Sequence, residues 1–227
     1  MSGRHGLPAA VLFDMDGTLI DSEPHWQRAE TELMAEHGFT WSHADATLCL
    51  GGPLTRVGDI MAARLGPDAA ISSQEIQGEL MERMEDLLRR NPLVWRPGAR
   101  SLLAETLALG IPTALVTATY RRLIDAVHVT IAEDLGGEPF TVVVGGDEVT
   151  NGKPHPEPYL AAAAALAAEP GRCLVIEDSP TGVASGHAAG CRVIAVEYLA
   201  HIEPRERVHI VSTLDGRGLE DLWHAAN

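Results

Sequence analysis

The feature that most constrains the fold is a series of short apolar runs separated by stretches of helical character. The runs are apolar throughout and do not alternate with polar residues, which is typical of parallel strands buried on both faces. They occupy residues 9–13, 111–116, 141–145, 173–176, 192–196 and, more weakly, 208–214. This alternation predicts the α/β fold class, with a doubly wound parallel sheet covered by helices on both faces.

About 75 residues without a strand pattern separate the first run from the helix expected at 97–109. That length far exceeds an ordinary connection between a strand and a helix, so it predicts an inserted unit with its own core. Its helices are expected at residues 23–37, 55–65 and 72–91. We therefore predict a catalytic core of residues 1–21 and 94–227 and a helical cap domain of residues 22–93. The cap could close as a lid over a site. The alternative is a rigid helical insert that does not move.

Composition narrows the class of protein. The chain has 227 residues, 45% of them hydrophobic, and a formal net charge of −15. Such an acidic chain lacks the clustered lysines and arginines that neutralise nucleic-acid phosphates. No run approaches the roughly 18 apolar residues of a membrane span, and no secretory signal is visible. The three cysteines form no metal-binding or CxxC pattern. We expect a cytoplasmic protein with neither a nucleic-acid nor a membrane partner.

Four polar clusters follow four of the predicted strands, at the point where each strand ends. Their members are Asp14 with Asp16, Thr117 with Ala118, Lys153, and Glu177 with Asp178. Each cluster alone has an ordinary explanation as a turn, a strand end, a solvated lysine or a helix cap. The carboxyl ends of parallel strands share one edge of the sheet, where open α/β sheets bind ligands, so these side chains can converge.

The converging residue types predict phosphoryl chemistry. Four carboxylates in one pocket repel each other unless cations are present, and oxygen ligands favour Mg²⁺ together with substrate phosphate oxygens. Asp14 is the candidate nucleophile for a covalent aspartyl-phosphate, and Asp16 is the candidate acid and base. Lys153 would spread the charge of the phosphoryl oxygens, and Thr117 and Ala118 would bind those that remain.

On these motifs the chain resembles the haloacid dehalogenase superfamily of aspartate-nucleophile phosphotransferases. The four motifs match Asp14-Met15-Asp16-Gly17-Thr18, Thr117, Lys153 and Glu177-Asp178. The resemblance implies a Rossmann-like core that carries Mg²⁺. The ion would be bound by the Asp14 carboxylate, the Asp16 backbone carbonyl and Asp178, with Glu177 acting as a ligand or just outside the ligands.

The predicted cap resembles that of the β-phosphoglucomutase-like subgroup. Dehalogenating relatives lack the second aspartate of the first motif, so Asp16 indicates phosphate chemistry. Mutases carry a histidine in the first cap helix. Here that position is Trp26, with His25 one residue earlier, and one residue rotates a helical side chain by about 100°. His25 and Trp26 are therefore candidate substrate contacts of the cap. Arg56 is a third candidate, because the glycine-containing segment 51–56 between two cap helices could face the substrate, although a plain turn explains its glycines equally well.

These observations predict a Mg²⁺-dependent phosphatase that hydrolyses a small phosphomonoester, with a sugar phosphate as one candidate. A β-phosphoglucomutase-like phosphomutase is the alternative. A phospho-accepting regulatory module is a third and weaker alternative, because a switch gains nothing from a hydrolytic acid and a lid. We expect a small phosphorylated metabolite as the partner and a monomer or weak homo-oligomer.

Overall fold

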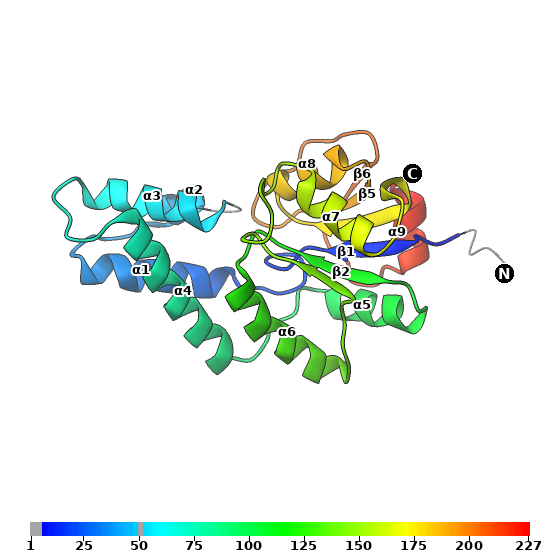
Figure 1. The fold of residues 1–227 in the computed structure, drawn as a ribbon, viewed down its shortest axis with the longest axis horizontal. Coiled ribbons are helices and arrows are strands. Elements are labelled where there is room, and N and C mark those ends of the chain that lie inside the picture. The colour runs from blue at the N-terminus through cyan, green and yellow to red at the C-terminus, as the bar shows by residue number, and fades with distance from the viewer. Residues whose placement is uncertain (1–5, 50–51) are drawn as a thin grey trace.

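The computed structural model describes residues 6–49 and 52–227. Its centre is a sheet of six parallel strands in the order β3-β2-β1-β4-β5-β6 (Figure 1). The strands are β1 (Ala10–Phe13), β2 (Thr113–Val116), β3 (Val142–Val144), β4 (Cys173–Glu177), β5 (Arg192–Val196) and β6 (Val208–Val211). Each lies within or next to a predicted apolar run, and the predicted fold class is confirmed.

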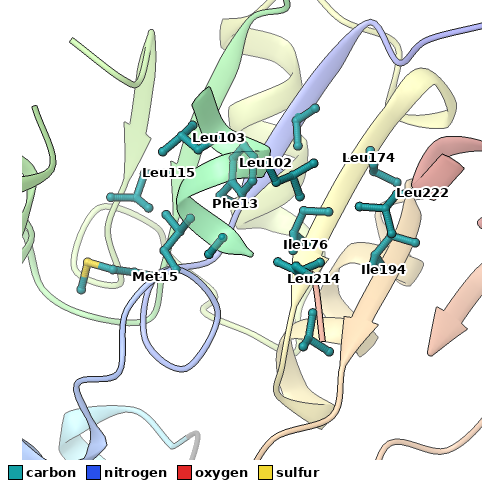
Figure 2. Packing of buried hydrophobic residues seen from close by; sticks show 14 of the residues in the cluster. Phe13, Met15, Leu102, Leu103, Leu115, Leu174, Ile176, Ile194, Leu214 and Leu222 are labelled. Carbon is teal, nitrogen blue, oxygen red and sulfur yellow. The ribbon is translucent and has the colours of Figure 1, made fainter. Parts of the chain in front are cut away.

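Both faces of the sheet are covered, because alternate residues of each strand point to opposite sides. Val11 and Phe13 pack into one hydrophobic cluster, and Ala10 and Leu12 pack into another. The first cluster is covered by α5 (Ala99–Ala108), α6 (Arg121–Leu135) and α9 (Leu219–Ala225). Figure 2 shows Phe13 there among leucine and isoleucine side chains from neighbouring strands and α5. The second is covered by α7 (Glu157–Ala165) and α8 (Pro180–Ala188), with the short turn η1 (Pro170–Arg172) before β4.

The described residues between β1 and α5 form four helices, and we call this part of the chain the helical insert. They are α1 (Glu23–Glu36), α2 (His43–Cys49), α3 (Leu54–Leu65) and α4 (Ser73–Arg90). They share a separate hydrophobic cluster, and the predicted capping box at Ser72 and Glu75 opens α4. The exact division into residues 1–21 with 94–227 and 22–93 stays a prediction, and residues 1–5 and 50–51 of these ranges lie outside the described residues. No helix in the described part of the chain could span a membrane.

Two segments connect the helical insert to the sheet, and they run side by side. The Asp21 amide donates to the Val94 carbonyl at 2.8 Å, and the Arg96 amide donates to the Leu19 carbonyl at 2.8 Å. The Arg96 guanidinium lies 3.4 Å from the centre of the Tyr198 ring, and the Tyr198 hydroxyl donates to Asp21 at 3.0 Å. These contacts tie both connections to the loop after β5. The helical insert therefore lies beyond the carboxyl ends of the strands (Figure 1).

Candidate active site

A buried charge cluster lies where β1 and β4 end. Lys153 Nζ donates to Asp14 Oδ1 at 2.7 Å, to Glu177 Oε1 at 2.6 Å and to the Val116 carbonyl at 2.9 Å. The Lys153 side chain is only 4% exposed. All three donor hydrogens of the ammonium therefore have acceptors, and the lysine is fixed in position. Lys153 holds Oδ1 of Asp14, so Oδ2 is the candidate oxygen for chemistry.

The protonation of Asp14 reflects the balance of these charges. Burial and the neighbouring Glu177 raise the pKa of Asp14 to about 7, although Lys153 lowers it. Burial alone would lower the pKa of Lys153, but Asp14 and Glu177 outweigh burial and raise it above the ordinary value. Lys153 is therefore charged at neutral pH. One lysine is not enough to keep every carboxylate of the cluster ionised.

Asp16 points away from this cluster. Its Oδ2 accepts hydrogen bonds from the Thr119 hydroxyl at 2.7 Å and the Thr117 hydroxyl at 3.3 Å, and its Oδ1 accepts from the Ser22 hydroxyl at 2.5 Å. These donors come from the end of β2 and the start of the helical insert, so the carboxylate of Asp16 is held beside the Asp14 carboxylate but separate from it. The two acids of the first motif consequently have different surroundings, as different chemical roles require.

Asp178 lies on the opposite side of Asp14. Burial, followed by the charges of Asp14 and Glu177, raises the pKa of Asp178 well above its usual range. The Thr18 hydroxyl donates to its Oδ1 at 3.3 Å. Gly17 has a φ of +82°, and a Cβ at that position would lie 2.1 Å from Asp178 Oδ2. The glycine of the first motif is therefore required both by the turn and by the close approach of this carboxylate.

Glu177 is fully buried and already saturated with hydrogen bonds. Besides Lys153, its Oε1 accepts from the Tyr159 hydroxyl at 3.0 Å, and its Oε2 accepts from the amides of Asp178 and Ser179 at 2.9 and 3.0 Å. Gly182 gives it room, since a Cβ there would lie 1.6 Å from Oε1. The arrangement suits a residue that positions Lys153 and the backbone of Asp178 better than one that changes partners during a reaction.

The residues at this edge fit a divalent cation. Carboxylate oxygens of Asp14, Glu177 and Asp178 lie within 4.8 Å of one another. All are hard oxygen donors. Burial, and after it the neighbouring carboxylates, raise the pKa of Asp14 and Asp178, so a further cation would stabilise their charged forms. A magnesium ion matches both the donor type and the missing charge. Asp14 and Asp178 are the better ligand candidates, because hydrogen bonds already occupy Glu177.

A cavity opens above these residues toward the helical insert. Its base is lined by Asp14, Asp16, Asp178, Lys153 and the Thr117–Thr119 loop that contains Ala118. Its far wall comes from the helical insert, where Glu23, Trp26 and Glu30 of α1 take part. The structure thus brings together all the candidate residues at the strand ends. Only their functional roles remain predictions.

The three candidate substrate contacts of the cap lie in different places. Trp26 lines the cavity. His25 lies instead in a small crevice beside the connecting segments, next to Leu88 and Leu93. Arg56 donates to the Leu48 carbonyl at 3.1 Å and is not among the described residues that line the cavity. Contact of His25 and Arg56 with substrate therefore has no support from this arrangement, whereas contact of Trp26 does.

Several residues of the site were not anticipated from the sequence. Tyr159 is fully buried and bonds Glu177, Thr119 bonds Asp16, and Glu30 lies in the cavity wall. The spacing of Glu23, Trp26 and Glu30, at i, i+3 and i+7, was a usable signal for the last of these, because it places them on one face of a helix. The sequence contains no such signal for Tyr159, since a tyrosine in an alanine-rich helix is expected to pack in the hydrophobic core.

The geometry agrees with what comparison with known proteins shows. Residues 8–190 match the model of the haloacid dehalogenase-like hydrolase family. The chain belongs to this family. The predicted family and the prediction of a hydrolytic enzyme are both confirmed.

Individual relatives cover most of the chain. It is 35% identical over 201 residues to hexitol phosphatase A of Escherichia coli K12, covering 88% of each chain. It is 33% identical to protein CbbY of Rhodobacter capsulatus over 191 residues, covering 82% of this chain and 83% of that protein. A crystal structure of CbbY from Rhodobacter sphaeroides with xylulose-(1,5)bisphosphate superimposes with a TM-score of 0.82 at 27% identity, covering 95% and 99% of the two chains.

Proposed function

We propose that the protein is a Mg²⁺-dependent phosphatase that hydrolyses a small phosphomonoester through an aspartyl-phosphate on Asp14. The observation that carries this proposal is the pair of aspartates at the end of β1. Lys153 holds one oxygen of Asp14, and hydroxyl groups hold Asp16 beside it, at the base of a cavity. Similarity to hexitol phosphatase A supports a small phosphorylated metabolite as the substrate class.

In the first step, Asp14 Oδ2 attacks phosphorus in line with the ester oxygen. The new P–O bond to Asp14 forms as the bond to the alcohol breaks, and Asp16 gives its proton to the departing oxygen. The charge of Lys153 and the backbone amide of Ala118 stabilise the equatorial phosphoryl oxygens, while the Thr117 hydroxyl keeps its hydrogen bond to Asp16. Bound Mg²⁺ would add positive charge at the same oxygens.

In the second step, water hydrolyses the aspartyl-phosphate. Asp16, now a carboxylate, takes a proton from the water as the water oxygen attacks phosphorus, and the bond to Asp14 breaks. Inorganic phosphate leaves, and both aspartates return to their starting states. Hydrogen bonds from Ser22, Thr117 and Thr119 hold Asp16 in place for both proton transfers.

The helical insert acts as a cap over this chemistry. We take residues 22–93 as the cap domain, because α1 to α4 share their own hydrophobic cluster and supply the far wall of the cavity. A wall of this kind limits the access of bulk water and strengthens the electrostatic interactions inside. The two adjacent segments at Asp21 and Arg96 are the natural place for a hinge.

Hydrolysis is favoured over the phosphomutase alternative by one observation in the cap. The mutases that the chain resembles have a histidine in the first cap helix, and the position that resembles it here is Trp26, which lines the cavity. His25 lies outside the cavity, in the crevice by the connecting segments. The indole of Trp26 cannot serve as an acid or base at neutral pH.

Phosphate release from a panel of phosphorylated metabolites tests the proposal. Activity should disappear with excess chelator and return with Mg²⁺. Asp14→Asn should lower kcat at least a thousandfold, whereas Asp68→Asn, at an exposed site, should leave it unchanged. Sustained turnover by Asp14→Asn would refute the covalent route. An isomeric sugar phosphate formed without free phosphate would identify a mutase.

A further inference from the structure

The cavity is unusually poor in positive charge for a site that receives a phosphate ester. Among the described residues that line it, Lys153 is the only cation, and it is also the only lysine of the sequence. Five carboxylates line the same space: Asp14, Asp16, Asp178, Glu23 and Glu30. Lys153 and a bound divalent ion would offset the charge at the base. None of the described residues of the far wall that line the cavity is a cation. Arg56 lies behind Gly52 of this wall, and its guanidinium donates to the Leu48 carbonyl.

The two acids of the far wall are held by hydrogen bonds and have no cationic partner among the described residues. Glu23 and Glu30 lie two helical turns apart on the face of α1 that lines the cavity. Glu30 is 4% exposed, and its Oε2 accepts a hydrogen bond from the Trp41 indole at 2.9 Å. Glu23 accepts from the Gln27 amide at 3.2 Å. Among the described residues, no arginine, lysine or histidine forms an ion pair with either acid.

This distribution restricts what the substrate can carry beyond its phosphate. A second phosphate or a carboxylate at the far end would meet buried carboxylates without a compensating cation, which costs several kcal/mol. A purely apolar group would leave the free carboxylate oxygens without hydrogen-bond donors. Hydroxyl groups satisfy both conditions, because they donate to carboxylates and carry no charge. The indole of Trp26 adds an apolar surface for the carbon chain.

We propose that the substrate is a monophosphate whose remaining part is uncharged and rich in hydroxyl groups. Glu30, together with Glu23, determines this specificity by accepting hydrogen bonds from the hydroxyl groups of the substrate. The inference rests on the proposed phosphatase function and specifies its substrate class. Burial raises the pKa of both glutamates to about 7, in agreement with acids that have no cationic partner.

A matched pair of substrates tests the proposal. D-glucitol 6-phosphate ends in CH₂OH, and 6-phospho-D-gluconate has a carboxylate in its place. The wild-type enzyme should show at least tenfold higher kcat/KM for the first. Glu30→Gln should raise KM for glucitol phosphate more than it lowers kcat. It should also reduce the preference for glucitol phosphate at least fivefold, because the repulsion of the carboxylate is lost.

The preference ratio separates specificity from a structural role, since general damage to the site lowers both activities together. Glu32→Gln, on the exposed side of α1, is the control and should leave the ratio unchanged. An unchanged ratio in Glu30→Gln, or a wild-type preference for phosphogluconate, would overturn the inference. So would a tenfold preference for glucosamine 6-phosphate over glucose 6-phosphate, which would identify an ammonium site. If the wild-type enzyme hydrolyses no phosphomonoester, including p-nitrophenyl phosphate, the proposed function itself fails.

Discussion

The buried acid Glu30 should lower the stability of the fold at neutral and alkaline pH. Burial raises its pKa from 4.5 to about 7, although the Trp41 indole stabilises the charged form. That difference corresponds to about 3 kcal/mol of unfolding free energy. Glu30→Gln removes the buried charge, fills nearly the same volume and keeps an oxygen that can accept the Trp41 hydrogen bond. We therefore expect the variant to be more stable than the wild type by about 2–3 kcal/mol at pH 8.

The sign of the pH dependence follows from proton uptake. Between pH 4.5 and 7 the folded wild type holds a proton on Glu30 that the unfolded chain has released. The stability of the wild type therefore falls as pH rises through this window, by about 1.4 kcal/mol per pH unit at most. The stability of Glu30→Gln should not fall in this way, because glutamine does not ionise. The two proteins should have similar stability near pH 4.5 and diverge up to about pH 7.

Urea denaturation followed by tryptophan fluorescence between pH 4.5 and 8 measures this difference. At pH 8 the melting temperature should also rise, by about 2–4 °C for each kcal/mol. Glu32→Gln, whose carboxylate is exposed and paired with Arg28, should change stability by no more than about 0.5 kcal/mol at any pH. A Glu30→Gln protein no more stable than wild type at pH 8, or a difference independent of pH, would refute the reasoning.

Three further predictions concern the base of the site. Lys153→Met leaves Asp14 and Glu177 buried without their shared cation, so we expect a loss of about 3–5 kcal/mol in urea denaturation at pH 8, and a smaller loss at pH 5.5 where the carboxylates gain protons. Gly17→Ala should weaken Mg²⁺ binding at least tenfold in calorimetry, because the new methyl group displaces the carboxylate that lies above it. Tyr159→Phe removes one hydrogen bond to Glu177, which Lys153 still holds, so unfolding experiments should show a loss of only about 1–2 kcal/mol.

The sheet and the strand-end residues could be predicted because each depends on local sequence. A run such as 173–176 is apolar at every position, which is typical of a strand buried on both faces. Once the strands are parallel, the segments that carry Asp14, Lys153 and Asp178 leave the sheet at one edge, so these side chains can meet there. The last expected strand was extended to residue 214, but it ends at Val211, since side chains beyond it pack as core without sheet pairing.

The far wall of the cavity could not be predicted to the same degree, because it depends on contacts between distant segments. The side chain of Glu30 is buried by Trp41, which lies 11 residues later and outside α1. In the sequence, Glu30 is simply an acid in an amphipathic helix, a pattern typical of a solvated surface. Likewise, the sequence spacing indicated both His25 and Trp26 as candidate substrate contacts. Only the packing of α1 decides which of them lines the cavity.

The properties of Glu30 point to charge as the reason for its presence. A glutamine would fill the same space, accept the same indole hydrogen bond and avoid the cost of an ionised group in a buried position. The two side chains differ chiefly in negative charge, and that charge faces the cavity. A fold that keeps a destabilising group at such a place exchanges stability for function. On the proposed function, we expect this charge to act on the substrate, with the phosphate at the Lys153 end of the cavity and no second anion at the Glu30 end.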